Sequence, residues 1–113
     1  MYVTMLYRGD PVRLTSAAVF ESLVDFVESL PDAQGRFPMT LQWEGRGAYY
    51  PRDQVPALAA ELAAVEQELV HAGGQRASDF GPPLRRWRAM AQWCARAREP
   101  VLVEVACARA ARQ

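Results

Sequence analysis

Hydrophobic and polar residues recur along the chain with two different periods, and these periods predict its elements. The run Tyr2–Tyr7 is β-branched and aromatic and stops at Gly9-Asp10-Pro11, which is typical of a strand closed by a turn. Apolar residues then recur at helical spacing until Pro31, and Thr15 or Ser16 is placed to cap this helix. Its predicted apolar stripe is Val19, Phe20, Leu23, Phe26, Val27 and Leu30.

After Pro38 the period changes to two, with apolar residues at positions 39, 41 and 43. The segment Gly45-Arg46-Gly47 favours a turn, and Ala48-Tyr49-Tyr50 can return as a short strand. Residues 39–50 are therefore predicted to form a β-hairpin.

The clearest helical pattern lies between Asp53, a possible cap, and Gly73-Gly74, which supplies a left-handed stop. It predicts a helix of about four to five turns. Residues 75–82 are polar and contain glycine and proline, so they are predicted to form a loop, and a third helix is expected from about Pro83 to Arg98. The apolar positions are Val55, Leu58, Leu62, Val65 and Leu69 in the second helix and Leu84, Trp87, Met90, Ala91 and Cys94 in the third, with Trp93 on a flank.

The last element predicted is a strand over Val101–Cys107, followed by a tail over residues 108–113. This strand is apolar on both faces, which is typical of a strand at the centre of a sheet and covered on both sides. The predicted order is β-α-β-β-α-α-β, and no linker divides residues 1–113, so we expect one domain. The simplest α+β fold places three helices against one face of a mostly antiparallel sheet of about four strands.

The composition indicates the cell compartment in which we expect the protein. Half of the residues are hydrophobic, which is enough to bury a core without metals or disulfides. No apolar stretch is long enough to cross a bilayer, and the N-terminus lacks the features of a signal peptide. Cys94 and Cys107 lie in apolar patterns and are expected to be reduced, buried thiols. We therefore expect a cytoplasmic protein with no membrane partner.

No arrangement of residues predicts a catalytic or metal centre. His71 is the only histidine, and it falls in the last turn of the second helix, where the helix dipole favours it. No spacing brings it to Cys94 or Cys107, and no metal-ligand motif or phosphate-binding loop occurs. We therefore expect no enzyme activity, no metal and no cofactor. An enzyme acting through carboxylates would need two acids that converge in a cleft, with at least one strongly perturbed pKa.

The net charge is zero, but the charges are unevenly distributed. Residues 1–75 carry ten acids and five arginines, and residues 76–113 carry eight arginines and three acids. Glu21, Asp25 and Glu28 step by four and three residues, so they share one face of the first predicted helix. Such an acidic stripe suits a basic surface on a partner, and it is equally the pattern of an ordinary solvated face.

Arginines interleaved with Trp87 and Trp93 on the third predicted helix raise nucleic-acid binding as an alternative. A pI near 6.6 and the place of Trp87 on the apolar stripe argue against it. The more ordinary explanation is that arginines pair with Glu61, Glu66 or Glu68 on the neighbouring helix. The arginines concerned are Arg85, Arg86, Arg88, Arg96 and Arg98.

The segment Gly35-Arg36-Phe37-Pro38 precedes the predicted hairpin. Gly35 is expected to permit an unusual backbone turn, Phe37 to point inward and Pro38 to set the entry into the strand. Arg36 is placed to tether Asp32, and a binding role is its second interpretation.

This region resembles the small bacterial immunity proteins of polymorphic toxin systems, specifically immunity protein family seventy. The resemblance runs from Phe20 to Leu69 and includes the segment 35–38, the strand to Trp43, the turn at 45–47 and Tyr50-Pro51-Arg52-Asp53. Two departures are visible. Gly35 directly precedes Arg36, one residue closer than in the family, and Arg52 stands where an acid is expected. The C-terminal third is similar only in its final apolar strand.

The resemblance implies an inhibitor that binds and neutralises a cognate protein toxin. An acidic surface would mimic phosphate charge for a toxin that acts on nucleic acid. The residues expected to contact the partner are Glu21, Asp25 and Glu28, with Tyr49 as an exposed aromatic anchor and Arg36 in addition. The alternative is a non-catalytic adaptor or homo-oligomerising domain without a toxin partner, in which the exposed sheet edge pairs with a second copy as a homodimer.

Overall fold

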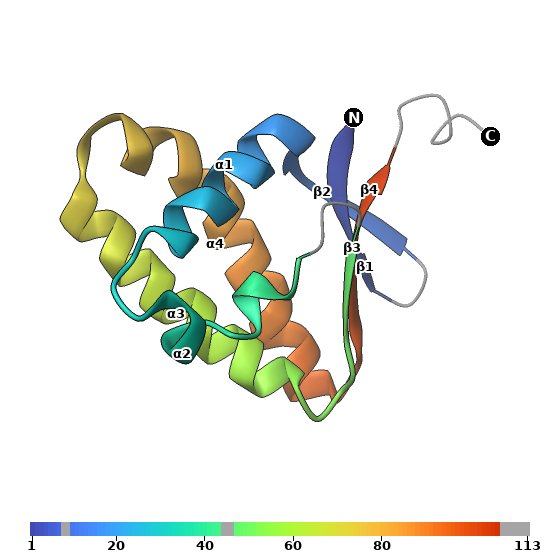
Figure 1. The fold of residues 1–113 in the computed structure, drawn as a ribbon. Helices are drawn as coiled ribbons and strands as arrows, with labels where there is room; N and C mark the ends of the chain where they lie inside the picture. Colours follow the sequence, from blue (N-terminus) through green and yellow to red (C-terminus); the bar gives the residue numbers. More distant parts are fainter. Residues whose placement is uncertain (8–9, 44–46, 107–113) are drawn as a thin grey trace.

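The computed structural model describes residues 1–7, 10–43 and 47–106 of the chain. Strands and helices make up most of this part (Figure 1). In chain order the elements are β1 (Tyr2–Tyr7), β2 (Asp10–Ser16), α1 (Ala17–Glu28), α2 (Ala33–Arg36), the 3-10 turn η1 (Thr40–Gln42), β3 (Gly47–Tyr50), α3 (Val55–Ala72), α4 (Gly74–Ala97) and β4 (Val101–Ala106).

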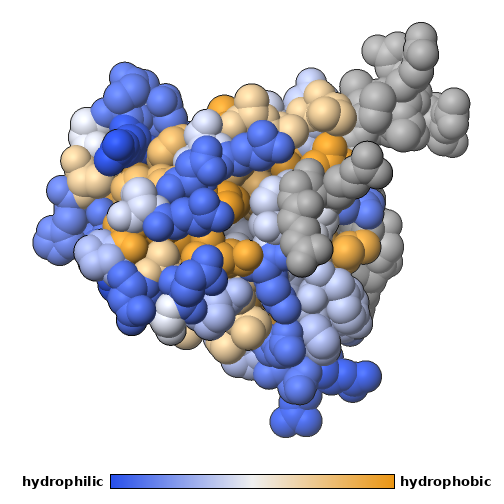
Figure 2. All heavy atoms as spheres, in the orientation of Figure 1, coloured by the Kyte–Doolittle hydropathy of each residue, from blue (hydrophilic) through white to orange (hydrophobic). Residues whose placement is uncertain are grey.

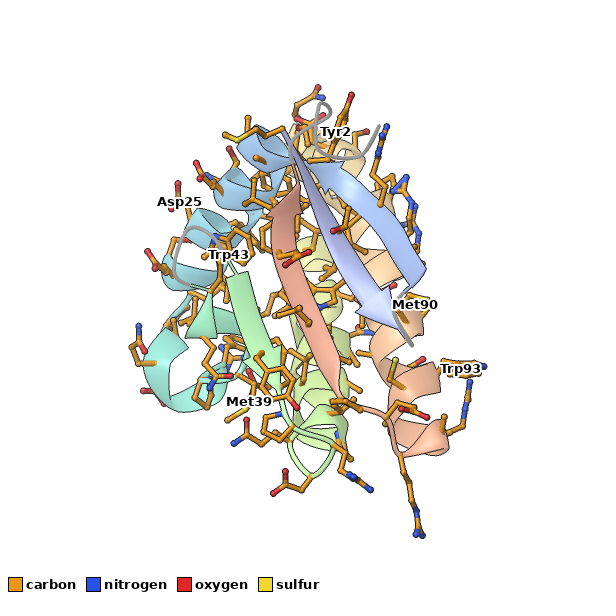
Figure 3. The ribbon with its side chains drawn as sticks, turned by 90° about the vertical axis from the view of Figure 1, so that its right-hand side faces the viewer. Tyr2, Asp25, Met39, Trp43, Met90 and Trp93 are labelled. Atoms are coloured by element: carbon orange, nitrogen blue, oxygen red, sulfur yellow. The ribbon has the colours of Figure 1, made fainter. Side chains whose placement is uncertain are left out.

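The strands form one antiparallel sheet in the order β2-β1-β4-β3, and the helices lie against one face of it. Figure 3 looks onto the opposite face, with the helices behind. The α+β class, the four-stranded antiparallel sheet and the three long helices are confirmed. β4 is central, as its apolar composition predicts. However, no helix or strand of the described part covers its outer face, so the expected burial on both sides is wrong.

The second strand lies earlier in the chain than the alternation predicts. β2 follows β1 almost at once and pairs with it from Tyr7 opposite Asp10 to Tyr2 opposite Ser16. A bulge opposite the Val3–Thr4 step leaves Leu14 as an extra, buried residue. As an edge strand, β2 needs only one apolar face. Its sequence is therefore largely polar and does not predict a strand.

The expected strand over residues 39–43 is absent, and η1 occupies its place. The cause is a tertiary contact. The carboxylate of Glu61 on α3 accepts hydrogen bonds from the backbone N–H groups of Met39 (3.1 Å) and Thr40 (2.9 Å) and from the Thr40 hydroxyl (3.1 Å). These bonds hold the backbone in a tight turn. Residues 47–50 do form a strand, but it pairs with β4, and residues 44–46 lie outside the described part.

Tyr50 on β3 completes this network. Its side chain is fully buried, and its hydroxyl donates a hydrogen bond to the carbonyl oxygen of Met39 at 2.7 Å. Burial, and secondarily the negative charge of Glu61, raise the pKa of Tyr50 well above its ordinary value. The phenol therefore stays neutral in the fold beyond the pH at which an exposed tyrosine ionises.

We expect Tyr50→Phe to lower the free energy of unfolding at neutral pH by about 1–2 kcal/mol, because the Met39 carbonyl loses its donor. The raised pKa adds a pH dependence. The stability that wild type gains from neutral Tyr50 is complete below the unfolded-state pKa of about 10 and falls as pH rises above it. Denaturant titrations from about pH 8 to pH 11 should show the difference in free energy of unfolding between wild type and variant becoming smaller as pH rises. A gap independent of pH would contradict this assignment.

α3 ends as predicted, at Gly73 with a positive φ of 61°. α4 begins immediately, so the predicted loop over residues 75–82 is wrong. Pro82 and Pro83 lie inside α4, whose first part runs at an angle to the rest (Figure 1). Proline removes an N–H donor, and here the helix bends and continues. As a result α4 carries Phe80 against Phe26 of α1, with ring centroids 6.1 Å apart.

The core is aromatic beneath α1. Phe20 lies between Trp43 and Trp87, at centroid distances of 4.7 and 5.0 Å. Trp87 is 1% exposed, which confirms its predicted place in the core. Cys94 is also buried as expected, and burial, followed by the nearby Glu99 charge, raises the pKa of its thiol. Cys107 lies outside the described residues, as does the predicted tail.

Candidate functional site

The three acids of the predicted stripe lie on the solvent side of α1. Ser16 begins this helix by accepting a hydrogen bond from the N–H of Val19 at 3.3 Å. Burial of the apolar stripe then leaves Glu21, Asp25 and Glu28 exposed, which confirms that they share one face. We call these three residues the acidic ridge. Within the described part of the chain, their carboxylates form no ion pair.

A shallow hollow of about 240 Å³ borders the acidic ridge. All three ridge acids line it, together with Val24 and the Trp43 side chain. Figure 3 shows Asp25 and Trp43 on the same side of the molecule. Trp43 reaches this position because η1 ends there, whereas the alternation over residues 39–43 predicts it in a strand.

A groove runs along the other side of α1, between this helix and the start of α4. It consists of two hollows, of about 330 and 200 Å³, that share Ser22 and Phe80. Figure 2 shows hydrophilic side chains over α1 with hydrophobic surface beside them. The sequence does not predict this groove, because Phe80 lies in the segment whose composition is typical of a loop. Its other lining residues are Thr15, Ala18, Val19, Asp25, Phe26, Ser29, Arg76 and Asp79.

Arg36 is engaged within the chain. Its guanidinium pairs with Glu68 of α3 at 2.7 Å and donates to the carbonyl oxygen of Pro31 at 3.4 Å. It therefore ties α2 to α3, and the expected tether to Asp32 is not among its contacts with described residues. Gly35 leaves room for the Asp32 carboxylate, which would lie 2.7 Å from an added Cβ. The unusual backbone conformation expected at Gly35 belongs to Asp32, with φ of 52°.

Tyr49 lies apart from the acidic ridge. It is 57% exposed on the sheet face that points away from the helices, opposite Leu102 of β4. It does not line the hollow beside Trp43. The structure therefore brings three of the five predicted contact residues together and separates Arg36 and Tyr49 from them.

The arginines of α4 join elements of the fold. Arg88 pairs with Glu66 of α3, which confirms one of the expected partners. Arg86 instead donates to the Leu14 carbonyl of β2 at 3.1 Å. Arg86 and Arg88, two of the five arginines considered for nucleic-acid binding, thus have structural roles.

The described residues contain no group of three or more His, Cys, Asp or Glu side chains placed to hold a metal ion. His71 is exposed in the last turn of α3, as predicted from the helix dipole. In the same part of the chain, no helix combines the length and apolar character needed to span a bilayer.

Comparison with protein-family models, with curated proteins and with solved structures found no match to this chain. The resemblance to immunity protein family seventy therefore stays a prediction, and the surface of α1 is the feature from which a function can be argued.

Proposed function

We propose that this protein is a non-catalytic inhibitor of the immunity-protein kind, which binds a cognate protein toxin through α1. The observation that carries the proposal is the acidic ridge, whose carboxylates are exposed and flanked by a hollow on one side and a groove on the other. Aligned charges favour encounter with a basic surface, and the recesses beside them can seat the partner's side chains.

The arrangement of the acids also indicates the kind of toxin. Successive acids lie about one helical turn apart, near 5–6 Å, so they present negative charge along a line. A nucleic-acid backbone presents its phosphates in a comparable row. A toxin whose active surface binds nucleic acid through lysine and arginine would be complementary to this ridge, and covering that surface would inhibit it.

The recesses beside the ridge would contribute apolar contacts. Phe26 and Phe80 line the groove, and Trp43 lines the hollow. Apolar side chains of the partner can be desolvated there, while the acids provide association rate and orientation. Trp43 is only partly buried, so its fluorescence offers a signal for binding at this surface.

The test begins with co-purification of the partner from the native cell. The variant Glu21→Gln/Asp25→Asn/Glu28→Gln keeps the side-chain shapes and removes the charge. We expect its affinity for the partner to fall by about 10- to 100-fold at low salt, and by less at about 0.5 M salt, where screening already weakens the wild type. Binding is measured by calorimetry and by the fluorescence of the tryptophans.

Asp53→Asn is the matched control, because Asp53 is an exposed aspartate in the turn before α3, off the ridge. It should bind the partner as wild type does. Equal affinity of the triple variant and wild type at both salt concentrations would remove the ridge from the interface and with it this proposal.

A further inference from the structure

The sheet face away from the helices has the composition of a contact surface. The outer side of β4 carries the apolar Leu102 beside the charged Glu104, and no described helix or strand lies over it (Figure 3). This outer face carries Tyr2, Thr4, Arg13, Tyr49, Leu102 and Glu104.

One row across this face bears opposite charges on its two sides. Arg13 of β2 and Glu104 of β4 are both opposite Thr4 of β1, which separates them. Because neighbouring strands lie about 4.8 Å apart, the two charged residues are roughly 10 Å apart. The Arg13 guanidinium lies over the ring of Tyr2, 3.7 Å from its centroid. Glu104 is half-buried, and no ion pair joins it to another residue in the described part of the chain.

We propose that this face binds a second copy of the chain in a face-to-face dimer. Its two-fold axis lies between the two sheets and runs parallel to β1. Rotation about that axis places β2 of one copy over β4 of the other. Arg13 then faces Glu104 of the partner subunit, and Glu104 faces Arg13 of the partner subunit. The two pairs are equivalent, as an isologous interface requires. Thr4 at the centre is only 8% exposed in the single chain, so the contacts come from the residues around it, and its small side chain permits the usual spacing of about 10 Å between packed sheets.

The area of the face sets the strength of this dimer. Three overlapping strands of six residues cover roughly 300 Å² per copy. Stable interfaces bury about 800 Å² per partner, so we expect a weak dimer, and a range of roughly 10 µM to 1 mM is the one in which its self-association is to be measured. The helices lie on the other side of the sheet (Figure 1), so the acidic ridge of each copy remains exposed in the dimer.

Sedimentation equilibrium of the full chain over this concentration range tests the proposal. The Arg13→Glu chain has only acids in the row, and the Glu104→Arg chain has only arginines. Each alone should self-associate at least tenfold more weakly than wild type. Mixed in equal amounts, they restore opposite charges at both positions and should associate nearly as well as wild type. Arg85→Glu, the same change at an exposed residue of α4, should leave self-association unchanged.

A wild-type chain that stays monomeric up to about 1 mM overturns the proposal without any variant. So does self-association that neither charge reversal weakens, or a mixture of folded single variants that fails to associate. Circular dichroism establishes that each variant is folded. If a charge reversal unfolds the chain, the neutral variants Arg13→Gln and Glu104→Gln are used instead. Each should weaken self-association about threefold or more. If neither of them weakens self-association, the proposal is overturned.

Discussion

Glu61→Ala is expected to lower the free energy of unfolding by about 2–4 kcal/mol, far more than loss of an ordinary helix-surface glutamate. Its carboxylate accepts three hydrogen bonds from Met39 and Thr40. Thr40 is 1% exposed, so its donors cannot turn to water when the acceptor is removed. Urea denaturation followed by circular dichroism measures the loss.

The matched control is Glu68→Ala on the same helix. This change removes the partly exposed ion pair with Arg36, which contributes about 0–1 kcal/mol at most. If the two variants lose equal stability, the Glu61 bonds do not hold η1 in the way described. The loss of stability in Glu61→Gln should lie between the losses in Glu61→Ala and Glu68→Ala. An amide keeps one acceptor oxygen but cannot accept a hydrogen bond at its nitrogen.

Phe20→Ala should cost about 3–5 kcal/mol, because it removes a fully buried ring and leaves a cavity. The ring packs against both Trp43 and Trp87, so the fluorescence of the folded variant should change as well. A loss of this size is comparable with the whole stability of a small domain, about 5–15 kcal/mol. Thermal and denaturant unfolding, followed by tryptophan fluorescence, are the measurements.

Val70→Ala serves as the comparison, since Val70 is 69% exposed on α3 and its truncation should change stability by less than about 0.5 kcal/mol. If Phe20→Ala unfolded at nearly the same denaturant concentration as Val70→Ala, the aromatic cluster beneath α1 would not be the packed core described above.

The sequence predicts best where periodicity extends over many residues. α1 and α3 each show a long apolar stripe with end signals, Ser16 for one and Gly73 for the other, and both helices form as expected. The same periodicity places Glu21, Asp25 and Glu28 on one exposed face, because burying the stripe fixes the rotation of the helix.

Prediction fails where a distant residue decides the local structure. Residues 39–43 have a strand-like alternation, but the carboxylate that holds them in a turn belongs to Glu61, 21 residues beyond Thr40. Likewise, the polar start of α4 resembles a loop. It is helical in the structure, where Gln75 donates to Asp79 at 2.8 Å and Phe80 packs on Phe26. Neither effect is visible in a short window of sequence.

The candidate site was predictable only in part for the same reason. The exposure of Tyr49 follows from alternation, but its separation from the acidic ridge depends on the three-dimensional fold. The pairing of Arg36 with Glu68 joins residues 32 positions apart. The groove beside α1 requires α4 to begin at Gly74, which the Gly- and Pro-containing sequence concealed.

The pairing of β1 with β4 has a consequence for biosynthesis. Tyr2 lies opposite Ala106. Of the strands in the sheet, β1 is therefore translated first and its neighbour β4 last. Until β4 is translated, β1 can pair only with β2, and β3 has no neighbour in its own sheet. The nascent chain therefore exposes unpaired strand edges from the translation of β1 until that of β4, an interval in which contact with other nascent chains is damaging.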